Sequence, residues 1–357
     1  MPAPPPPPAG GRRRWKHRLS PTLARDRCYA RSFRAAGLRQ AAVPLPDGTV
    51  LHFLLPSPDP ALHPVLLLHG FGANATWQWA PFLRPLLAAG LAPFVPDLVF
   101  FGDSASPSSH RSPVYQAASV AAAMASLPGA PQRHAVVGVS YGGFVAYHLA
   151  HAFPAVVERL VLVAAGVCLE KADLAAGLFA VEDITEAASL LLPQRPEDLR
   201  RLVALTFCRP PKFMPSCFIR DYIRVMCTEN VKEKTELLYA LISSRKLSDL
   251  PKINQALLLG RLPSPGRCPS PIRAQALPGS LSDAPDVMCY AWAPARCQGH
   301  LVSIHQALLL VPTSSCSHCD HKQFVFYYRI NKVFFIFSIP RKPFPQGLKD
   351  PMEGVPS

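Results

Sequence analysis

Strands and helices alternate along the first half of the chain, and this alternation constrains the fold more than any other feature of the sequence. Four nearly continuous apolar runs are each typical of a buried strand, and they span residues 63–70, 91–99, 134–140 and 157–166. Helical periodicity separates each run from the next. Strands that are apolar along both faces are covered on both sides, so the pattern predicts a mostly parallel α/β sheet between two layers of helices.

Two further segments complete the predicted domain. Around Asp47-Gly48, the alternation in residues 41–56 predicts a two-residue β-hairpin at the entrance to the domain. From residue 167 to residue 250 the strand signal disappears and helical periodicity replaces it, which predicts a helical lid over the carboxyl edge of the sheet. The expected core comprises residues 28–166, and residues 251–261 return to its sheet.

The two ends of the chain differ from the predicted domain in charge and in composition. The formal charge of +14 resides at the ends, because residues 41–255 contain equal numbers of basic and acidic side chains. Residues 1–27 are rich in proline and arginine, which predicts a disordered basic arm. After residue 261 the chain becomes rich in proline, serine and cysteine, so residues 262–357 are expected to form an atypical or disordered C-terminal segment.

The composition also limits the partners that we expect. A folded nucleic-acid-binding domain would carry its basic patch on the domain itself, so we expect no nucleic acid as a partner. The sequence contains no apolar run of 18 or more residues, so we expect a soluble protein without a membrane span. We expect it in the cytoplasm, and the basic N-terminal arm leaves targeting to an organelle as the alternative. The oligomeric state stays open.

The cysteine and histidine residues of the sequence do not indicate a metal site. We interpret the ten cysteines mostly as free thiols, because no secretory signal opens the chain. Residues 316–321 (CSHCDH) have the residue types and spacing of zinc ligands, but a closed zinc site needs a second pair, and none is evident in the sequence. We therefore expect neither a metal nor another cofactor.

The strand at 134–140 ends in the pattern Gly-Val-Ser-Tyr-Gly, and a helical pattern follows directly. This is the Gly-x-Ser-x-Gly pattern of a nucleophile elbow, in the position that an elbow requires. The turn forces the serine into a strained conformation that exposes its oxygen, and side chains at Gly138 or Gly142 would collide with the adjacent strand and helix. Ser140 is therefore the candidate nucleophile, and the alternative is a tight turn with an incidental serine.

An acyl group attacked by a serine develops an oxyanion, which needs two hydrogen-bond donors. The backbone N–H of Tyr141, at the start of the helix, is predicted to supply one of them. The other is expected from a loop after an earlier strand, where residues 69–72 read His-Gly-Phe-Gly. The Phe71 N–H is our candidate, with His69 and Gly70 serving the geometry of the loop rather than proton transfer.

Three stretches of the sequence together resemble the α/β-hydrolase superfamily, namely residues 66–79 (LLLHGFGANATWQW), 95–107 (VPDLVFFGDSASP) and 136–150 (VVGVSYGGFVAYHLA). The resemblance covers residues 28–255 and is to the lid-bearing branch, which includes meta-cleavage-product hydrolases and monoacylglycerol-lipase-like esterases. It implies that residues 97–104 support the elbow, with Asp103 in a packing and hydrogen-bonding role rather than in a catalytic triad. Phe100 and Phe101 are expected to line the mouth of the pocket or to fill the core.

The resemblance further implies a triad in the order serine, acidic residue, histidine. The family places the acid just after the strand that returns from the lid, but here Gly260 is followed by Arg-Leu-Pro-Ser, without a carboxylate. Asp249, Asp283 and Asp286 are the substitutes that the sequence offers, and none fits the pattern. An alternative interpretation is that the chain from about residue 256 is a shifted C-terminal end rather than the tail typical of the family.

The histidine of the family follows a glycine and precedes an apolar residue. Residues 297–305 (CQGHLVSIH) offer His300 after Gly299, with His305 nearby. The family continues into a glutamate-proline pair and a closing helix, which this sequence lacks. His300 is the candidate base on this short match.

These features predict a serine hydrolase that cleaves an ester or a related acyl bond in a small, largely apolar substrate, with weak activity if its triad is incomplete. In this hypothesis Ser140 attacks and His300 serves as the base, while the N–H groups of Phe71 and Tyr141 bind the oxyanion. The alternative is a non-catalytic protein of the same fold that binds a ligand or a partner. Epoxide hydrolases and dehalogenases share the architecture but use a carboxylate at the elbow, so the serine disfavours them.

Overall fold

A computed structural model describes the chain over residues 20–72, 74–167, 184–206, 211, 213–242, 251–253, 255–261, 287–291, 323–330 and 333–340. From residue 256 onward it describes strands through their backbone alone. His300, Asp249, Asp283 and Asp286 lie outside the described residues.

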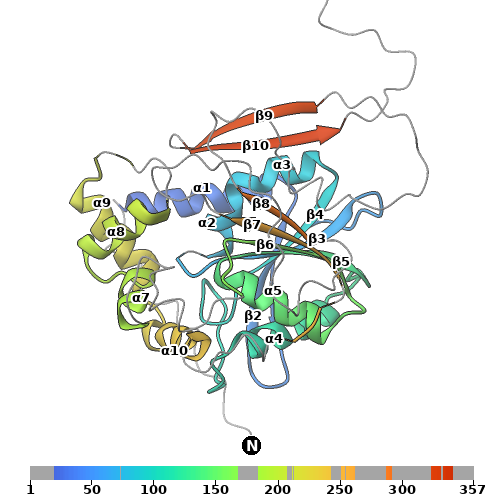
Figure 1. Ribbon diagram of the computed structural model, residues 1–357, viewed down its shortest axis with the longest axis horizontal. Helices are drawn as coiled ribbons and strands as arrows, with labels where there is room; N and C mark the ends of the chain where they lie inside the picture. The colour runs from blue at the N-terminus through green and yellow to red at the C-terminus, as the bar shows by residue number, and fades with distance from the viewer. Residues whose placement is uncertain are drawn as a thin grey trace, which may run out of the picture.

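An eight-stranded sheet lies at the centre of the described structure, in the strand order β1-β2-β4-β3-β5-β6-β7-β8 (Figure 1). The bounds of these strands are β1 (Arg39–Pro44), β2 (Val50–Leu55), β3 (His63–Leu68), β4 (Leu91–Pro96), β5 (His134–Val139), β6 (Val157–Val163), β7 (Ala256–Arg261) and β8 (Val287–Ala291). β1, β2 and β4 pair antiparallel, and every pairing from β4 to β8 is parallel. The predicted mostly parallel sheet is therefore confirmed, with an antiparallel hairpin at one edge.

The hairpin predicted at Asp47-Gly48 connects β1 and β2, but its loop is longer than the two residues expected. The Leu45 N–H donates to the Thr49 carbonyl at 2.7 Å, which leaves residues 46–48 as the loop. Gly48 has a φ of +82°, the left-handed conformation that completes a three-residue hairpin. The Asp-Gly pair thus indicates the hairpin correctly but not the length of its loop.

Helices cover both faces of the sheet. Successive side chains of each strand point to opposite sides, so each strand contributes to an apolar cluster on both faces. Val65 and Leu67 of β3 pack in one apolar cluster with Trp79, whereas Leu66 and Leu68 belong to the cluster on the other face. Figure 1 shows the two helical layers above and below the sheet. The first layer contains α1 (Pro21–Ala35), α2 (Ala75–Trp79), η1 (Ala80–Phe82) and α3 (Leu83–Ala88), and the second contains α4 (Pro113–Ser126) and α5 (Tyr141–Ala152).

A set of helices between β6 and β7, called here the helical insertion, occupies the part of the chain for which helical periodicity was predicted. It contains α7 (Ile184–Leu191), α8 (Pro196–Thr206), α9 (Ser216–Tyr222), the π-helical turn η2 (Ile223–Cys227) and α10 (Val231–Ile242). The insertion lies on the left of Figure 1, beside one end of α1. Leu237 and Leu238 of α10 are buried in the same cluster as Leu66 and Leu68, so the insertion packs on the domain rather than standing apart from it.

Helix α1 begins at Pro21, inside the segment 1–27 that was predicted as a disordered arm. The predicted end of the arm at residue 27 is therefore wrong. Ser20 caps the helix with its side chain, and proline suits the first helical position because the N–H that it lacks would have no partner there. The Asp221 carboxylate of α9 accepts the Ser20 hydroxyl at 2.8 Å and the Thr22 N–H at 2.9 Å. The start of α1 is therefore held by the helical insertion, a long-range contact that the local sequence does not reveal.

Asp221→Asn is expected to lower the free energy of unfolding by about 1 to 2 kcal/mol near neutral pH. Asp221 also pairs with Arg224 at 2.6 Å. Burial raises the pKa of Asp221, but the hydrogen bonds from its partners outweigh burial and lower the pKa to about 2. A carboxylate with a lowered pKa in the folded chain stabilises the fold above its unfolded pKa of about 4, and this contribution is lost as the pH falls toward 2.

Urea unfolding of the wild type and of Asp221→Asn, at a series of pH values, measures this difference. Asp198 of α8, which pairs with the exposed Arg195, provides the control, and Asp198→Asn is expected to cost well under about 1 kcal/mol. A difference between wild type and Asp221→Asn that does not shrink with acidification would contradict the role given to the Asp221 carboxylate.

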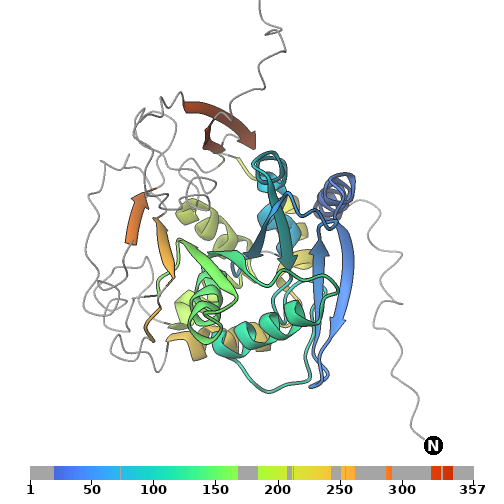
Figure 2. The same ribbon diagram turned by 90° about the vertical axis from the view of Figure 1, so that its right-hand side faces the viewer.

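Strands β8, β9 (Gln323–Ile330) and β10 (Val333–Pro340) fall within residues 262–357, the predicted atypical segment. β8 pairs in parallel with β7, so the sheet continues for one strand beyond residue 261, where the predicted return to the sheet ends. β9 and β10 pair antiparallel with each other in a two-stranded sheet separate from the main one (Figure 2). The other residues of this segment, and residues 1–19, lie outside the described residues.

Two smaller expectations concern cysteines and membranes. Cys28, Cys217 and Cys227 are free thiols, in line with the interpretation of the cysteines. Within the described parts of the chain, no helix combines the length and the apolar character needed to cross a bilayer.

Candidate functional site

Ser140 lies at the junction of β5 and α5, where a single residue turns the chain from strand to helix. Its φ of +53° and ψ of −118° lie in a region that favours glycine. The Ser140 N–H donates to the Val163 carbonyl of β6 at 2.8 Å, and the Ser140 carbonyl accepts the Gly143 N–H at 2.9 Å. These bonds hold the strained turn on both sides, as in a nucleophile elbow.

The Ser140 side chain is half-buried. Its hydroxyl has no hydrogen-bond partner within the described part of the chain. The hydrogen-bonding capacity of this oxygen is therefore unused among the described residues. His300, the base predicted for it, stays a prediction because it lies outside the described residues.

Two glycines permit the close packing of this turn. A Cβ added at Gly142 would lie 2.5 Å from the carbonyl oxygens of Leu68 and His69, at the end of β3. A Cβ added at Gly138 would lie 2.6 Å from the Cα atom of Gly143, in the first turn of α5. Glycine is the residue that allows such approach of one backbone to another, so both glycines are needed where the pattern has them.

The loop after β3, which carries Phe71, packs against the elbow. A Cβ added at Gly70 would lie 3.2 Å from the Ser140 Cβ, so this loop lies directly against the turn. The Phe71 and Tyr141 rings meet edge to face with a centroid distance of 5.2 Å. Among the residues that the structure describes, neither the Phe71 N–H nor the Tyr141 N–H has an acceptor. Ser140, Phe71 and Tyr141 therefore lie together, whereas the predicted base is not described.

His69 shapes this loop. Its ring is fully buried, and Nε2 accepts the Leu98 N–H at 3.0 Å. The proton is therefore on Nδ1, which donates to the Gly70 carbonyl at 2.8 Å. Burial lowers the pKa of His69 to about 4. A neutral histidine with both ring nitrogens engaged fits the loop-forming role expected for it, not proton transfer.

A cavity of about 460 Å³ opens beside the same loop. Phe71 and Gly72 line one part of it, and Phe100 and Phe101, which lie between β4 and α4, line another. The helical insertion contributes residues of α7, η2 and α10. Phe100 and Phe101 are also almost fully buried, so they both fill the core and line the cavity. Ser140 is not part of this lining, and the cavity meets the site at Phe71.

Asp97 directly follows β4, and it is a half-buried acid that sequence reasoning missed. Its carboxylate accepts the Ala75 N–H at 2.8 Å and the Asp103 N–H at 3.3 Å. Burial raises the pKa of Asp97 to about 7, although these hydrogen bonds oppose the shift. Asp103 is 77% exposed, so the hydrogen-bonding role expected of its side chain belongs to Asp97. His52, Asp97 and Asp103 offer ligand atoms within 4.8 Å of one another, but the Asp97 oxygens already accept main-chain N–H groups, and we assign no metal to them.

Tyr222 of α9 connects the helical insertion to the loop after Phe71. Its hydroxyl donates to the Gly72 carbonyl at 2.9 Å, and burial raises the pKa of Tyr222, so the hydroxyl keeps its proton. Its ring meets the Trp77 ring edge to face at 5.5 Å, and Trp77 donates through Nε1 to Asp26 of α1 at 2.9 Å. Sequence reasoning missed this link because the two partners lie 150 residues apart.

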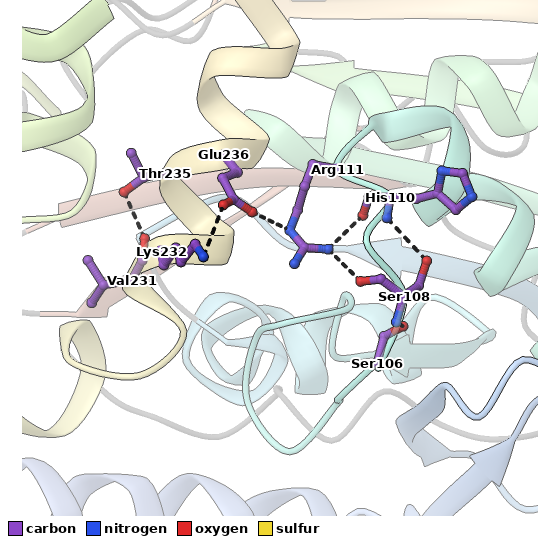
Figure 3. Close-up of polar contacts among 8 residues, drawn as sticks. All are labelled: Ser106, Ser108, His110, Arg111, Val231, Lys232, Thr235 and Glu236. Carbon is purple, nitrogen blue, oxygen red and sulfur yellow. Dashed lines mark hydrogen bonds and ion pairs between the residues drawn. The ribbon is translucent and has the colours of Figure 1, made fainter.

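Arg111 connects the helical insertion to the segment between β4 and α4, as Figure 3 shows. Its Nε donates to the Glu236 carboxylate of α10 at 2.8 Å. Its Nη1 donates to two carbonyls of its own loop, those of Ser108 and His110, at 2.6 and 3.0 Å. The guanidinium also lies 4.4 Å from the centre of the Phe100 ring. Helix α10 is therefore fixed beside the cavity.

Comparison with known proteins agrees with this geometry at the level of the family. Residues 65–312 match the model described as the alpha/beta hydrolase family. An uncharacterised protein of Mycobacterium tuberculosis is 34% identical over 130 residues, which are 36% of this chain and 36% of that protein. A protein of Mycobacterium bovis, also uncharacterised, matches to the same extent. The chain thus aligns with about a third of the length of these curated relatives.

Several solved structures share the fold. A bacterial membrane phospholipase A has a TM-score of 0.56 at 23% identity, covering 76% of this chain and 84% of that one. The epoxide hydrolase CorEH has a TM-score of 0.52 at 21% identity, covering 71% and 89%. Cfl2 of Burkholderia cenocepacia has a TM-score of 0.51 at 22% identity, covering 72% and 89%. At these identities the similarity concerns the fold alone.

Proposed function

Because this chain belongs to the alpha/beta hydrolase family, we propose that it is a serine hydrolase acting on an ester or a related acyl bond of a small, largely apolar substrate. The apolar part of the substrate lies in the cavity, where Phe71, Phe100 and Phe101 contribute to the walls. The reaction as proposed needs no cofactor, since the side chains and main chain supply every group that it uses. The helical insertion serves as the lid that selects the substrate.

In the proposed reaction, the Ser140 oxygen attacks the acyl carbon, its proton passes to the base, and the carbonyl oxygen becomes an anion. The N–H groups of Phe71 and Tyr141 donate hydrogen bonds to this anion. Collapse of the intermediate expels the alcohol, which takes the proton from the base, and leaves the acyl group on Ser140. Water, deprotonated by the same base, then releases the carboxylic acid and restores the serine.

One observation carries the proposal: the strained Ser140 turn packs against the loop of Gly70 and Phe71, and the Phe71 and Tyr141 N–H groups have no acceptor among the described residues. Phe71 and Tyr141 are 4% and 2% exposed. Buried main-chain N–H groups almost always have an acceptor. Two such groups without an acceptor at one turn are therefore suited to bind an anion that forms there. A strained residue other than glycine persists where its surroundings impose the conformation, and such residues cluster at functional sites.

His300 is our candidate for the base, and the acid of the triad stays unassigned. A serine hydroxyl at its free pKa is a poor nucleophile. Loss of a triad member leaves an acceleration of about 10³ to 10⁴ over the reaction in water, which comes from the oxyanion donors and substrate binding. The proposal therefore predicts an enzyme whose activity depends on the histidine.

Labelling with a fluorophosphonate probe tests the proposal, because such a probe phosphonylates an activated serine with release of fluoride. We expect the wild-type chain to carry one adduct, which mass spectrometry assigns to the peptide that contains Ser140. Ser140→Ala should carry none. Ser126→Ala is the matched control, since Ser126 lies exposed at the end of α4, and it should be labelled as fast as the wild type.

The histidine is tested in the same assay. His300→Ala should lower the rate of labelling by about 100-fold or more, and an unchanged rate would remove His300 from the mechanism. Circular dichroism establishes that each protein is folded. Folded wild-type chain that takes up no label would contradict the hydrolase and favour a non-catalytic protein that binds a ligand or a partner.

A further inference from the structure

Lys234 is a buried cation that has no counter-ion among the described residues, and it lines the cavity described above. It belongs to α10 and is 5% exposed. Its Nζ forms no ion pair with a carboxylate and no hydrogen bond within the described part of the chain. The Nζ lies 4.9 Å from the centre of the Phe101 ring. A cation over an aromatic face is attracted to it, but the ring does not replace an anion.

This arrangement is unfavourable for the protein alone. Taking an ammonium group out of water costs free energy unless an opposite charge accompanies it. Burial lowers the pKa of Lys234, and the thiol and carboxylate groups farther away counteract this shift in part. Arg224, which lines the same cavity, differs because Asp221 pairs with it. Lys234 is therefore a charged group in the lining for which a ligand can supply the missing partner.

The position of Lys234 is fixed on both sides along α10. Before it, the Asn230 amide donates to the Phe100 carbonyl at 3.0 Å. After it, Glu236 accepts the Arg111 guanidinium at 2.8 Å (Figure 3). These two bonds tie α10 to the segment that carries Phe100 and Phe101. The helix that carries Lys234 is thus held in place before a ligand binds, which lowers the entropic cost of binding.

The predicted oxyanion loop adjoins the same aromatic ring. The Phe71 ring lies 5.1 Å from the Phe101 ring, edge to face, while Lys234 contacts Phe101 at 4.9 Å. Phe71 and Lys234 therefore flank one apolar residue within one cavity. Of the three acidic lining residues, Asp103 and Glu229 are exposed, so water screens their charges. The third, Asp26, is half-buried and accepts the Trp77 Nε1–H at 2.9 Å.

From this geometry we infer that the cavity binds an ester of a dicarboxylic acid, whose free carboxylate pairs with the Lys234 ammonium while its acyl group lies at the Phe71 N–H. The inference rests on the proposed function and names the substrate class of the same site. The methylene groups between the two ends of the substrate lie against Phe101. A charge-assisted hydrogen bond in a site of low polarity is stronger than a neutral one, so the carboxylate contributes both affinity and selectivity.

Two esters that differ in one charge test this inference, namely mono-para-nitrophenyl glutarate and the same ester with its free carboxylate methylated. We expect the wild type to prefer the charged ester, and Lys234→Met to lower the ratio of the two kcat/KM values by about 10- to 100-fold. Lys234→Arg should keep the preference because it keeps the charge. Lys232→Met is the matched control: Lys232 lies on the same helix with a side chain that is 84% exposed, and both kcat/KM values should match those of the wild type.

Binding without turnover supplies an independent measurement. Calorimetric titration of Ser140→Ala with monomethyl glutarate and with dimethyl glutarate should give an affinity about 10-fold or more higher for the charged ligand. Adding Lys234→Met to this protein should abolish the difference. Thermal unfolding shows whether the Lys234→Met protein is folded, and Lys234→Gln takes its place if it is not.

The outcomes separate the two proposals. Binding of the charged ligand through Lys234, in a protein that hydrolyses neither ester, would contradict the hydrolase and support the anion site. The opposite result would overturn the anion site and support the hydrolase. In that result both esters are hydrolysed, the ratio of their kcat/KM values is the same in the wild type and Lys234→Met, and the two ligands bind with equal affinity.

Discussion

Replacing Ser140 by alanine is expected to lower kcat/KM for a para-nitrophenyl ester by about 10⁴-fold or more. In the proposed reaction the Ser140 oxygen forms the acyl bond, so its removal leaves the Phe71 and Tyr141 N–H groups and the cavity as the remaining sources of acceleration. Water would then have to attack the ester directly, without a positioned nucleophile. Initial-rate kinetics with the two proteins at matched concentration measure the difference, and a Ser140→Ala protein of nearly wild-type activity would refute the role of the serine.

Ser140→Gly is the matched variant that separates the chemistry from the backbone. It removes the same hydroxyl, but glycine adopts the φ of +53° without a Cβ clash. Relief of the backbone strain stabilises the folded Ser140→Gly protein by about 1 to 3 kcal/mol. The greater freedom of glycine in the unfolded chain destabilises it by about 0.5 to 1 kcal/mol. We therefore expect both variants to be inactive and Ser140→Gly to have the higher melting temperature. Equal melting temperatures would argue against strain at this turn.

Gly142→Ala is expected to destabilise the protein by about 3 kcal/mol or more, and it can prevent folding altogether. The added Cβ would lie 2.5 Å from the carbonyl oxygens of Leu68 and His69, which are main-chain atoms at the end of a central strand. Relief requires β3 and α5 to move apart, and that movement would also displace the Phe71 N–H from Ser140. The yield of soluble protein and urea unfolding measure the loss of stability, and ester hydrolysis measures the loss of activity.

Gly72→Ala, in the loop after β3, provides the control. A Cβ added at Gly72 meets no atom within 4 Å, and Gly72 has no left-handed conformation to lose. We expect its free energy of unfolding to stay within about 0.5 kcal/mol of the wild type. Equal stability of Gly142→Ala and Gly72→Ala would mean that the contact between β3 and α5 is looser than described.

The sheet and the elbow could be predicted because their signals are local. A parallel strand that is covered on both faces needs consecutive apolar residues, and the runs at 63–70 and 134–140 supply them. The glycines at 138 and 142 mark backbone contacts, since other residues do not fit there. The carboxyl ends of neighbouring parallel strands meet at one edge, so the approach of Phe71 to Ser140 follows from the order of β3 and β5.

The remaining parts of the site depend on partners that are distant in the sequence. Tyr222 and Lys234 belong to helices whose periodicity predicts core packing, and nothing in that periodicity indicates a carbonyl at Gly72 or an unpaired ammonium in a cavity. The bond from Ser20 to Asp221 spans 201 residues and moves the start of α1 into the predicted arm. Asp97 could have been suspected from its place directly after a buried strand, although its two N–H partners could not.

The bond between the Tyr222 hydroxyl and the Gly72 carbonyl couples the position of α9 to the loop that carries Phe71, and in the proposed enzyme this coupling would link substrate entry to catalysis. If α9 swings outward to admit a molecule, that carbonyl is released, and the peptide planes next to Phe71 can then rotate away from the serine. Return of the helix restores them. Loading and bond cleavage would accordingly take turns in each catalytic cycle, and an enzyme held open would fill but not react.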